Sequence, residues 1–378
     1  MSKKTKNLEQ LFDYLENEKL ISGAMLATEK GKPIFVRTLG KADVETDEDI
    51  QENTMFEIAS LTKAFTGMAI MVLQEQGKLN SLDPLYTYIP EFPYKEEGIT
   101  LHHLLTHTSG LPDYIEIFEE HWDRDLIAYN SDIIDYFIEN QPDLIAKPDG
   151  KFEYCNTGYI LLAEIIERLS GQAFGDFVKT HIFDPLGMSR TRAYAQRLEG
   201  PIDNYAKGYI YFKDEDRFEL PDGIDEHAYV YFLDGAKGDG QISSTVTDLF
   251  KWTESLTTSK LVNKGTVDQI FTPTKLKDDR QSHYTHGFHI GMKAGYGYGW
   301  KLEEDEELGK IITHDGYGAG YSSGIVIYPD HDITLIYISN LDYSEGLLNK
   351  IHHEVMLEME NIMFERPFKL PKLQVVKS

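Results

Sequence analysis

The 378-residue sequence contains a single cysteine, Cys155, which excludes an internal disulfide framework and a cysteine-rich metal site. It also has no apolar run that approaches the ~18 residues needed for a membrane-spanning helix. Basic residues are scarce, with 37 lysines and arginines against 63 aspartates and glutamates, a formal net charge of −26. Because nucleic acids and anionic membrane surfaces are also negatively charged, this balance predicts no nucleic-acid partner and no membrane insertion.

The first residues carry positive charge but lack the usual form of an export signal. Three lysines among residues 3–6 resemble the basic start of a signal peptide. Residues 7–20 are amphipathic and acidic, whereas a signal peptide needs an apolar stretch of roughly 7–15 residues. As written, the sequence predicts a cytoplasmic protein, or an exported or periplasmic one if a leader has been removed.

Hydrophobic periodicity predicts strands near both ends of the chain and helices between them. The expected strands are residues 21–27, 34–39, 298–302, 311–314, 322–328 and 333–339. The expected helices are residues 8–20, 60–77, 101–105, 131–140, 158–169, 244–256 and 347–364. Helix 60–77 is apolar nearly all round, which indicates burial. Two acidic segments, 214–225 and 303–307, are expected to form a surface loop and a solvated hairpin tip.

This order of elements predicts an α+β fold, with an antiparallel sheet flanked by helices and an inserted all-helical lobe. The strand-bearing segments 1–80 and 240–378 can share one sheet and so form a discontinuous domain. Residues 81–239 are then the mainly helical lobe. The length allows two such units, because domains average roughly 150 residues.

The first candidate for chemistry is the pair Ser60 and Lys63, which opens the apolar helix. Positions i and i+3 share one helix face, so the hydroxyl and the amine can meet. A serine hydroxyl needs a base to become a nucleophile, and a lysine in apolar surroundings can lose its proton near neutrality. The N–H groups at the helix N-terminus can also stabilise a reacting oxyanion. Taken alone, the pattern more often indicates a helix cap followed by a surface lysine.

A second candidate is Tyr154-Cys155-Asn156, which follows a turn and precedes a predicted helix. The tyrosine could relay a proton to a leaving group, and the asparagine amide could hold a substrate carbonyl or orient Lys63. The structural alternative is an aromatic loop anchor followed by a helix cap. For Cys155 we favour a small buried filler over a redox role.

The third candidate is His314-Asp315-Gly316, which ends a predicted strand and is followed by further glycines. Glycine lets the backbone approach a ligand closely. A backbone N–H just after the motif could complete an oxyanion hole with the N–H of Ser60. The alternative is a simple turn at the end of a strand.

The histidines are also grouped, which raises the question of a metal site. The members of one group are spaced three residues apart: His283, His286 and His289. The members of the other lie close together in the chain: His102, His103 and His107. Zinc sites usually add a cysteine or carboxylate ligand to such a spacing. We therefore expect no metal and no cofactor.

Together, the three motifs resemble those of the serine penicillin-recognising hydrolases. This family includes class C β-lactamases, D-alanyl-D-alanine peptidases, D-aminopeptidases and β-lactamase-like carboxylesterases. The match is Ser-x-x-Lys, then Tyr-x-Asn, then His-x-Gly in place of Lys-Thr-Gly. The intervals are 91 residues from Lys63 to Tyr154 and 160 from Tyr154 to His314. Flanking segments such as 104–111 and 238–244 are similar as well, so the resemblance runs from about residue 15 to about residue 345.

The resemblance implies that Ser60 is the acylated nucleophile, Lys63 its base and Tyr154 a second acid/base. It implies an oxyanion hole formed by the N–H groups of Ser60 and Tyr317. It places the active site between the sheet-bearing domain and the helical lobe. It further implies substrate-binding roles for four residues: Asn156, His314, Gly316 and Tyr317.

Three positions depart from the family pattern. His314 replaces a frequent lysine, Asp315 stands where a small residue is usual, and Gln241 interrupts a more usual glycine run. A cation at position 314 would help to bind a substrate carboxylate, and a carboxylate at 315 would repel one. Together with the net charge, this favours neutral substrates over anionic ones.

The sequence therefore predicts a serine hydrolase that forms an acyl-enzyme on ester or amide bonds, as an esterase or a D-amino-acid peptidase. Its expected partner is a small-molecule ester, peptide or β-lactam. One alternative is a penicillin-binding sensor or slow β-lactamase that acylates but deacylates poorly. Another is a structural interaction protein that has kept the fold.

Overall fold

A seven-stranded antiparallel sheet forms the centre of the computed structural model, which describes residues 2–278, 294–344 and 348–371. Its strand order is β10-β11-β12-β13-β14-β1-β2. The two ends of the chain meet where β1 pairs with β14, with Gly23 opposite Ser339. In chain order the strands are β1 (Gly23–Glu29), β2 (Lys32–Leu39), β10 (Gly295–Tyr296), β11 (Lys301–Asp305), β12 (Gly309–Gly318), β13 (Tyr321–Tyr328) and β14 (Ile333–Ser339).

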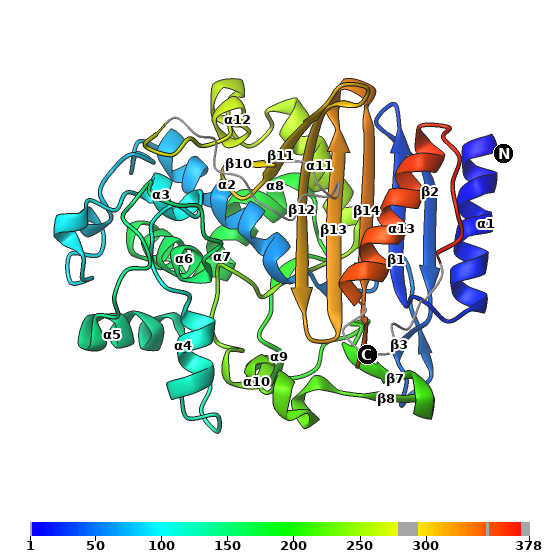
Figure 1. Ribbon diagram of the computed structural model, residues 1–378, viewed down its shortest axis with the longest axis horizontal. Helices are drawn as coiled ribbons and strands as arrows, with labels where there is room; N and C mark the ends of the chain where they lie inside the picture. The colour runs from blue at the N-terminus through cyan, green and yellow to red at the C-terminus, as the bar shows by residue number, and fades with distance from the viewer. Residues whose placement is uncertain (1, 279–293, 345–347, 372–378) are drawn as a thin grey trace.

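Helices cover both faces of this sheet (Figure 1). On one face lie α1 (Lys3–Asn17) and α13 (Leu348–Met363), and on the other lie α2 (Thr62–Glu75) and α11 (Val246–Thr258). Every residue of β13 and β14 is buried, as in a sheet covered on both sides. Successive strand residues point to opposite faces, so Met25 packs in the core with α1 and α13 while Leu26 packs in the core with α2 and α11.

The remaining helices gather mostly beside α2, at the β12 side of the sheet (Figure 1). They are α3 (Leu101–Leu105), α4 (Tyr114–His121), α5 (Asn130–Asn140), α6 (Asn156–Ser170), α7 (Phe174–Val178), α8 (Asp184–Leu186), α9 (Gln196–Glu199), α10 (Tyr229–Phe232) and α12 (Lys264–Ile270). The α6 helix packs against both α2 and α3. No helix in the described ranges is long and apolar enough to cross a membrane.

Three small sheets tie the loops together. They pair β3 (Lys41–Asp43) with β4 (Glu48–Asp49), β9 (Ile242–Ser244) with β5 (Phe56–Glu57) and β6 (Arg192–Ala193), and β7 (Tyr209–Phe212) with β8 (Arg217–Glu219) and β15 (Leu341–Tyr343). In the sheet of β5 and β9, β5 lies directly before the Ser60 motif in the chain.

The structure corrects three local expectations. The acidic segment 214–225 is not simply a loop, because it contains β8, which pairs with β7. Glu303 is buried and lies within β11, so the hairpin tip begins only after Asp305. The predicted strand 298–302 starts at Lys301, since Gly299 adopts a φ of +80° and packs closely against the Lys63 carbonyl.

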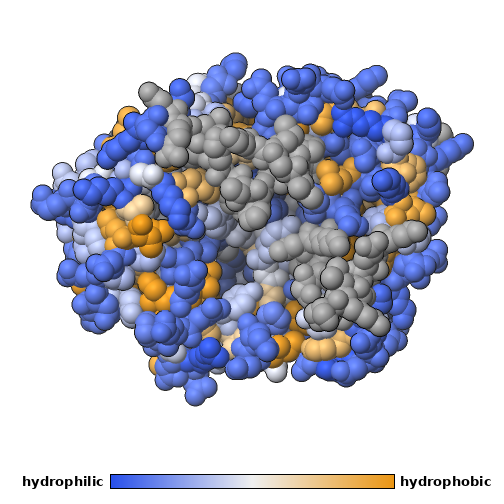
Figure 2. All heavy atoms as spheres, viewed as in Figure 1, coloured by the Kyte–Doolittle hydropathy of each residue, from blue (hydrophilic) through white to orange (hydrophobic). Residues whose placement is uncertain are grey.

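The exposed face is mostly hydrophilic, with scattered hydrophobic residues (Figure 2). This agrees with the strongly acidic composition.

Candidate active site

Ser60 lies in a short 3₁₀ turn, η1 (Ala59–Leu61), that leads into α2. The Ile58 N–H donates to the Ile242 carbonyl at 2.9 Å, and the Ser323 hydroxyl donates to the Ile58 carbonyl at 2.7 Å. The turn is therefore held between β9 and β13. Ala59 has a φ of +45°, a left-handed conformation that is costly for a residue with a Cβ. The backbone is thus strained directly beside the predicted nucleophile.

Lys63 is fully buried in the first turn of α2. Its Nζ donates to Ser60 Oγ at 3.1 Å and to the carbonyl oxygen of Asp239 at 2.9 Å. Burial lowers the pKa of this amine to about 8, against the opposing attraction of Asp239 and Asp113. A lysine with that pKa can act as a base near neutral pH.

Tyr154 is half-buried beside this lysine, with Lys63 Nζ 4.9 Å from the centre of its ring. The Tyr154 ring also stacks on His107, with ring centres 4.3 Å apart. His107 Nδ1 accepts a hydrogen bond from the Cys155 N–H at 3.0 Å. Burial and the nearby Lys63 hold the pKa of His107 well below its usual value, so its ring is neutral. The structure therefore brings Ser60, Lys63 and Tyr154 together.

Asn156 begins α6 and forms hydrogen bonds with Asp113, a residue outside the three sequence motifs. One carboxylate oxygen of Asp113 accepts from both the backbone N–H of Asn156 at 2.7 Å and its side-chain amide at 2.9 Å. The other oxygen caps α4 by accepting from the Ile115 N–H at 2.9 Å. An aspartate after a proline and before a helical segment is a recognisable cap signal, but nothing local shows that it also orients Asn156.

His314 is buried, and it is not among the residues that line the cavity next to Ser60. Its Nε2 lies 3.0 Å from the Tyr296 hydroxyl and its Nδ1 lies 2.7 Å from the carbonyl oxygen of Asp315. Burial, together with the nearby Lys301, lowers the pKa of His314 to about 3. His314 is thus a neutral imidazole and supplies no positive charge.

The two residues that follow His314, Asp315 and Gly316, have different environments. Asp315 forms an ion pair with Lys301, which lowers the pKa of the carboxyl group despite its burial. Gly316 packs against η1, where a Cβ would collide with the Ile58 carbonyl and press on the Leu61 N–H. This close approach places β12 against the Ser60 turn, and glycine is required for it.

A cavity of about 300 Å³ opens beside Ser60. Three predicted residues line it: Ser60, Asn156 and Tyr317. Gln241, which departs from the family pattern, also lines it. The lining further includes charged residues and tyrosines that the sequence motifs did not single out: Glu57, Arg197, Asp239, Tyr114, Tyr229 and Tyr321. A second cavity of about 280 Å³ shares Arg197 and Tyr321 with the first.

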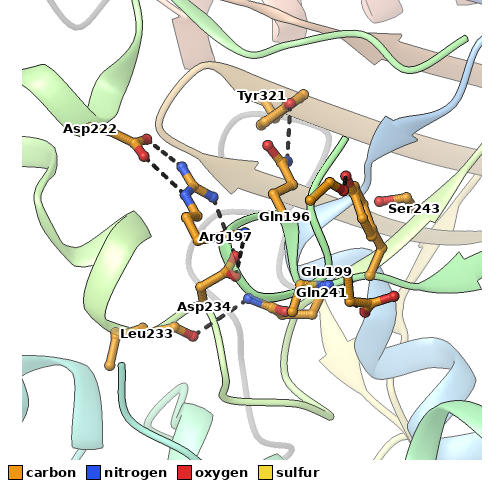
Figure 3. Close-up of polar contacts among 12 residues, drawn as sticks. Gln196, Arg197, Glu199, Asp222, Leu233, Asp234, Gln241, Ser243 and Tyr321 are labelled. Atoms are coloured by element: carbon orange, nitrogen blue, oxygen red, sulfur yellow. Dashed lines mark hydrogen bonds and ion pairs between the residues drawn. The ribbon is translucent and has the colours of Figure 1, made fainter. Parts of the chain in front are cut away.

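Arg197 lies between two carboxylates, Asp222 and Asp234 (Figure 3). Its Nε donates to Asp222 at 3.0 Å, its Nη2 forms a second bond to the same carboxylate, and its Nη1 donates to Asp234 at 3.3 Å. These partners raise the pKa of the guanidinium although burial opposes them. The cation is therefore already matched before any ligand arrives.

The grouped histidines have other partners. His102 bonds to the hydroxyls of Tyr298 and Thr274, both at 2.9 Å. His103 contacts Asp149 at 3.0 Å. His283, His286 and His289 lie outside the described residues. Within the described part of the chain, no group of three potential metal ligands occurs.

Comparison with known proteins gives one consistent result. The sequence model of the family described as Beta-lactamase matches residues 8–357. Penicillin-binding protein 4* of Bacillus subtilis (strain 168) is 37% identical over 374 residues, which cover 98% of this chain and 78% of that protein. A crystal structure of a penicillin binding protein from Bacillus halodurans has a TM-score of 0.76 at 27% identity and covers 93% of this chain and 98% of its own.

A D-amino acid amidase from Ochrobactrum anthropi SV3, complexed with L-phenylalanine amide, has a TM-score of 0.75 at 21% identity. The match covers 95% of this chain and 99% of the amidase. At 21% sequence identity, this similarity shows that the two proteins share a fold and nothing more specific.

Proposed function

The chain belongs to the beta-lactamase family, and from this premise we propose that it hydrolyses ester or amide bonds through an acyl-enzyme on Ser60. The observation that carries the proposal is the 3.1 Å contact between Lys63 Nζ and Ser60 Oγ at the edge of a cavity. Residues from both proposed units, 1–80 with 240–378 and 81–239, line that cavity.

In the first step, Ser60 Oγ attacks the substrate carbonyl carbon while its proton passes to the neutral Lys63 amine. The carbonyl oxygen becomes an oxyanion, which the N–H groups of Ser60 and Tyr317 stabilise. The tetrahedral intermediate then collapses and the leaving group departs with a proton delivered through Tyr154. The product is an ester between Ser60 and the acyl group.

In the second step, water attacks this ester and loses a proton to the same basic groups, and Ser60 recovers its own proton as the acid leaves. Asn156, oriented by Asp113, binds the substrate amide or carbonyl at the cavity wall. This cycle uses only side chains and backbone N–H groups of the chain.

The charges around the site favour substrates without a carboxylate. His314 is neutral, and Arg197 is bound to two aspartates. No other lysine or arginine is among the described residues that line the cavity. We therefore favour neutral or cationic esters and peptides over carboxylate-bearing β-lactams, which need a cationic partner.

The test compares three substrates: a short-chain p-nitrophenyl ester, a D-alanyl dipeptide amide, which has no free carboxylate, and a chromogenic cephalosporin. We expect turnover of the ester or the dipeptide to exceed that of the cephalosporin, and Ser60→Ala to abolish turnover and covalent labelling by a fluorophosphonate. Retained activity in Ser60→Ala would contradict the assignment of the nucleophile. Fast cephalosporin turnover with negligible ester activity would contradict the preference.

A second candidate is the penicillin-binding sensor that acylates but deacylates slowly, which the name of the Bacillus subtilis relative supports. It differs from the hydrolase only in the second step. One equivalent of product released in a burst, without later turnover, would identify it.

A further inference from the structure

Glu57 lies three residues before Ser60 and lines the same cavity. It belongs to β5, where it pairs with Ser243, so the ladder with β9 holds its backbone in place. Its side chain is only partly exposed. Within the described residues, the groups that act on this carboxylate do so by charge at a distance, and none forms a hydrogen bond or ion pair with it. Burying a carboxylate without a hydrogen-bond partner costs free energy, and a ligand that donates to the carboxylate would offset that cost.

Arg197 is the one cation among the described residues that line this cavity, and its Nε, Nη1 and Nη2 atoms already donate to Asp222 and Asp234. Figure 3 shows its guanidinium between Asp222 and Asp234, and its backbone N–H also donates to Asp234 at 2.8 Å. Among the described residues, the charged side chains that line the cavity are thus one matched cation, Arg197, and two carboxylates, Glu57 and Asp239. Asp239 accepts a hydrogen bond from the Tyr114 hydroxyl at 2.9 Å, so among the described residues Glu57 is the lining carboxylate that lacks a hydrogen-bond partner.

The rest of the cavity wall suits a cation as well. Tyr229 places its hydroxyl 3.0 Å from the Ala319 N–H, from which it accepts, and Tyr321 donates to the Ala206 carbonyl at 2.8 Å. These bonds fix two aromatic rings in the wall that contains Glu57. Aromatic faces attract ammonium groups, most strongly where water is excluded.

Gln241 adds a neutral acceptor to the same wall. Its Nε2 makes a long 3.5 Å contact with the Leu233 carbonyl, and its Oε1 is buried without a hydrogen-bond partner among the described residues. A buried amide oxygen without a donor costs free energy, and an N–H of a ligand could satisfy it.

Building on the proposed acyl-enzyme function, we propose that Glu57 binds a protonated primary amine carried by the acyl part of the substrate. Both Glu57 and Ser60 line the cavity and stand three residues apart in the chain, so an amine a few bonds from the reacting carbonyl can reach the carboxylate. The substrate class is therefore an ester or amide whose acyl group carries an ammonium, as an aminoacyl group does.

The titration of Glu57 supports this assignment. Burial raises the pKa of Glu57 to about 7, with Arg197 opposing and Asp234 and Asp239 adding to the rise. A bound ammonium would favour the ionised carboxylate and reverse that rise. Binding of an ammonium is therefore expected to be coupled to the ionisation of Glu57.

The experiment measures how well small amides slow the labelling of Ser60 by a fluorophosphonate in the intact protein. Alaninamide, as each enantiomer, is compared with isobutyramide, in which a methyl group replaces the ammonium. At about pH 7.5 Glu57 is mostly ionised, and an α-amine is still largely protonated. We expect at least one alaninamide enantiomer to protect Ser60 at about 10- to 100-fold lower concentration than isobutyramide, as for a charge-assisted hydrogen bond.

Glu57→Gln keeps the shape of the side chain and removes its charge, so it should abolish that difference while Ser60 is still labelled. Glu52→Gln, at an exposed position with the same change of charge, is the matched control and should leave it intact. Equal protection by alaninamide and isobutyramide in the wild type, or an unchanged ratio in a Glu57→Gln protein that still labels, would overturn the proposal. Failure of wild-type Ser60 to label would instead contradict the proposed function.

Discussion

Lys63 Nζ lies 3.1 Å from Ser60 Oγ, and its other hydrogen bond is to a neutral backbone carbonyl at 2.9 Å. A carboxylate at that distance would have stabilised the ammonium and raised its pKa. Among the described residues, the hydrogen-bond partners of Lys63 are a carbonyl and a hydroxyl, so burial dominates and the pKa of Lys63 falls to about 8. The same contact that positions the amine therefore leaves it free to accept the Ser60 proton.

The pH dependence of the reaction should report this group. Lys63 accepts a proton only when neutral, so kcat/KM should rise about tenfold per pH unit below about pH 8 and level off above it. The measurement is kcat/KM on an uncharged ester from about pH 6 to pH 10. A profile that is flat across pH 8 would contradict the assignment of Lys63 as the base.

Two variants connect that profile to Lys63. Lys63→Met should lower kcat/KM by about 10²- to 10⁴-fold and remove the rising limb from any residual activity. Lys260→Met, at an exposed position of the same charge, should change neither.

The sequence predicted this pair because the relationship is local. Ser60 and Lys63 are three residues apart, and an apolar helix around a lysine already indicates a buried amine. The antiparallel sheet was likewise predictable, since alternating and fully apolar runs identify β13 and β14. Its closure through β1 and β14 followed from strands at both ends of the chain.

The cavity walls were not predictable in this way. Glu57 and Arg197 come from separate parts of the chain and line one cavity only through the tertiary fold. The contact of Asp113 with Asn156 likewise joins residues far apart in the chain. The expected place of His314 at the cavity also depended on details beyond the motif, because Tyr296 and the burial of the imidazole decide its environment. A motif gives residue types and order, whereas partners across the fold determine charge and exposure.

Asp113 should prove to be a positioning residue for Asn156. Asp113→Ala removes the acceptor for both N–H groups of Asn156 and the cap of α4. We expect a loss of about 1–2 kcal/mol in the free energy of unfolding and a loss of roughly tenfold or more in kcat/KM. Both are measured on the same preparation, by urea denaturation and by ester hydrolysis.

Asp113→Asn separates the two effects. Asparagine caps helices as well as aspartate does, so stability should largely return, while the charge that holds the Asn156 amide is lost. Activity that recovers fully together with stability would show that Asp113 acts only on folding.

Cys155 should not react in the native protein, although it lies between Tyr154 and Asn156. Its side chain is 3% exposed and its Sγ donates to the Leu111 carbonyl at 3.4 Å. Burial raises the pKa of this thiol to about 12, so the reactive thiolate is scarce at about pH 8. Iodoacetamide should leave the native chain unmodified and alkylate one thiol after unfolding, since the sequence has one cysteine. Rapid alkylation of the native protein with loss of activity would contradict this burial.

Gln241 has a backbone conformation that glycine adopts more easily than other residues do. This agrees with its place in a segment where the family more usually has glycine. Its φ is +75°, and its Oε1 is buried without a partner among the described residues.

Gln241→Gly relieves the backbone strain and removes the oxygen, so the free energy of unfolding should rise by about 0.5–1 kcal/mol after the greater entropy of unfolded glycine is counted. Gln241→Ala removes the oxygen but keeps the strain, and its smaller gain would separate the two causes. Urea denaturation of the three proteins measures both effects, and a loss of stability in Gln241→Gly would mean that the glutamine side chain stabilises the cavity wall more than its backbone strain costs.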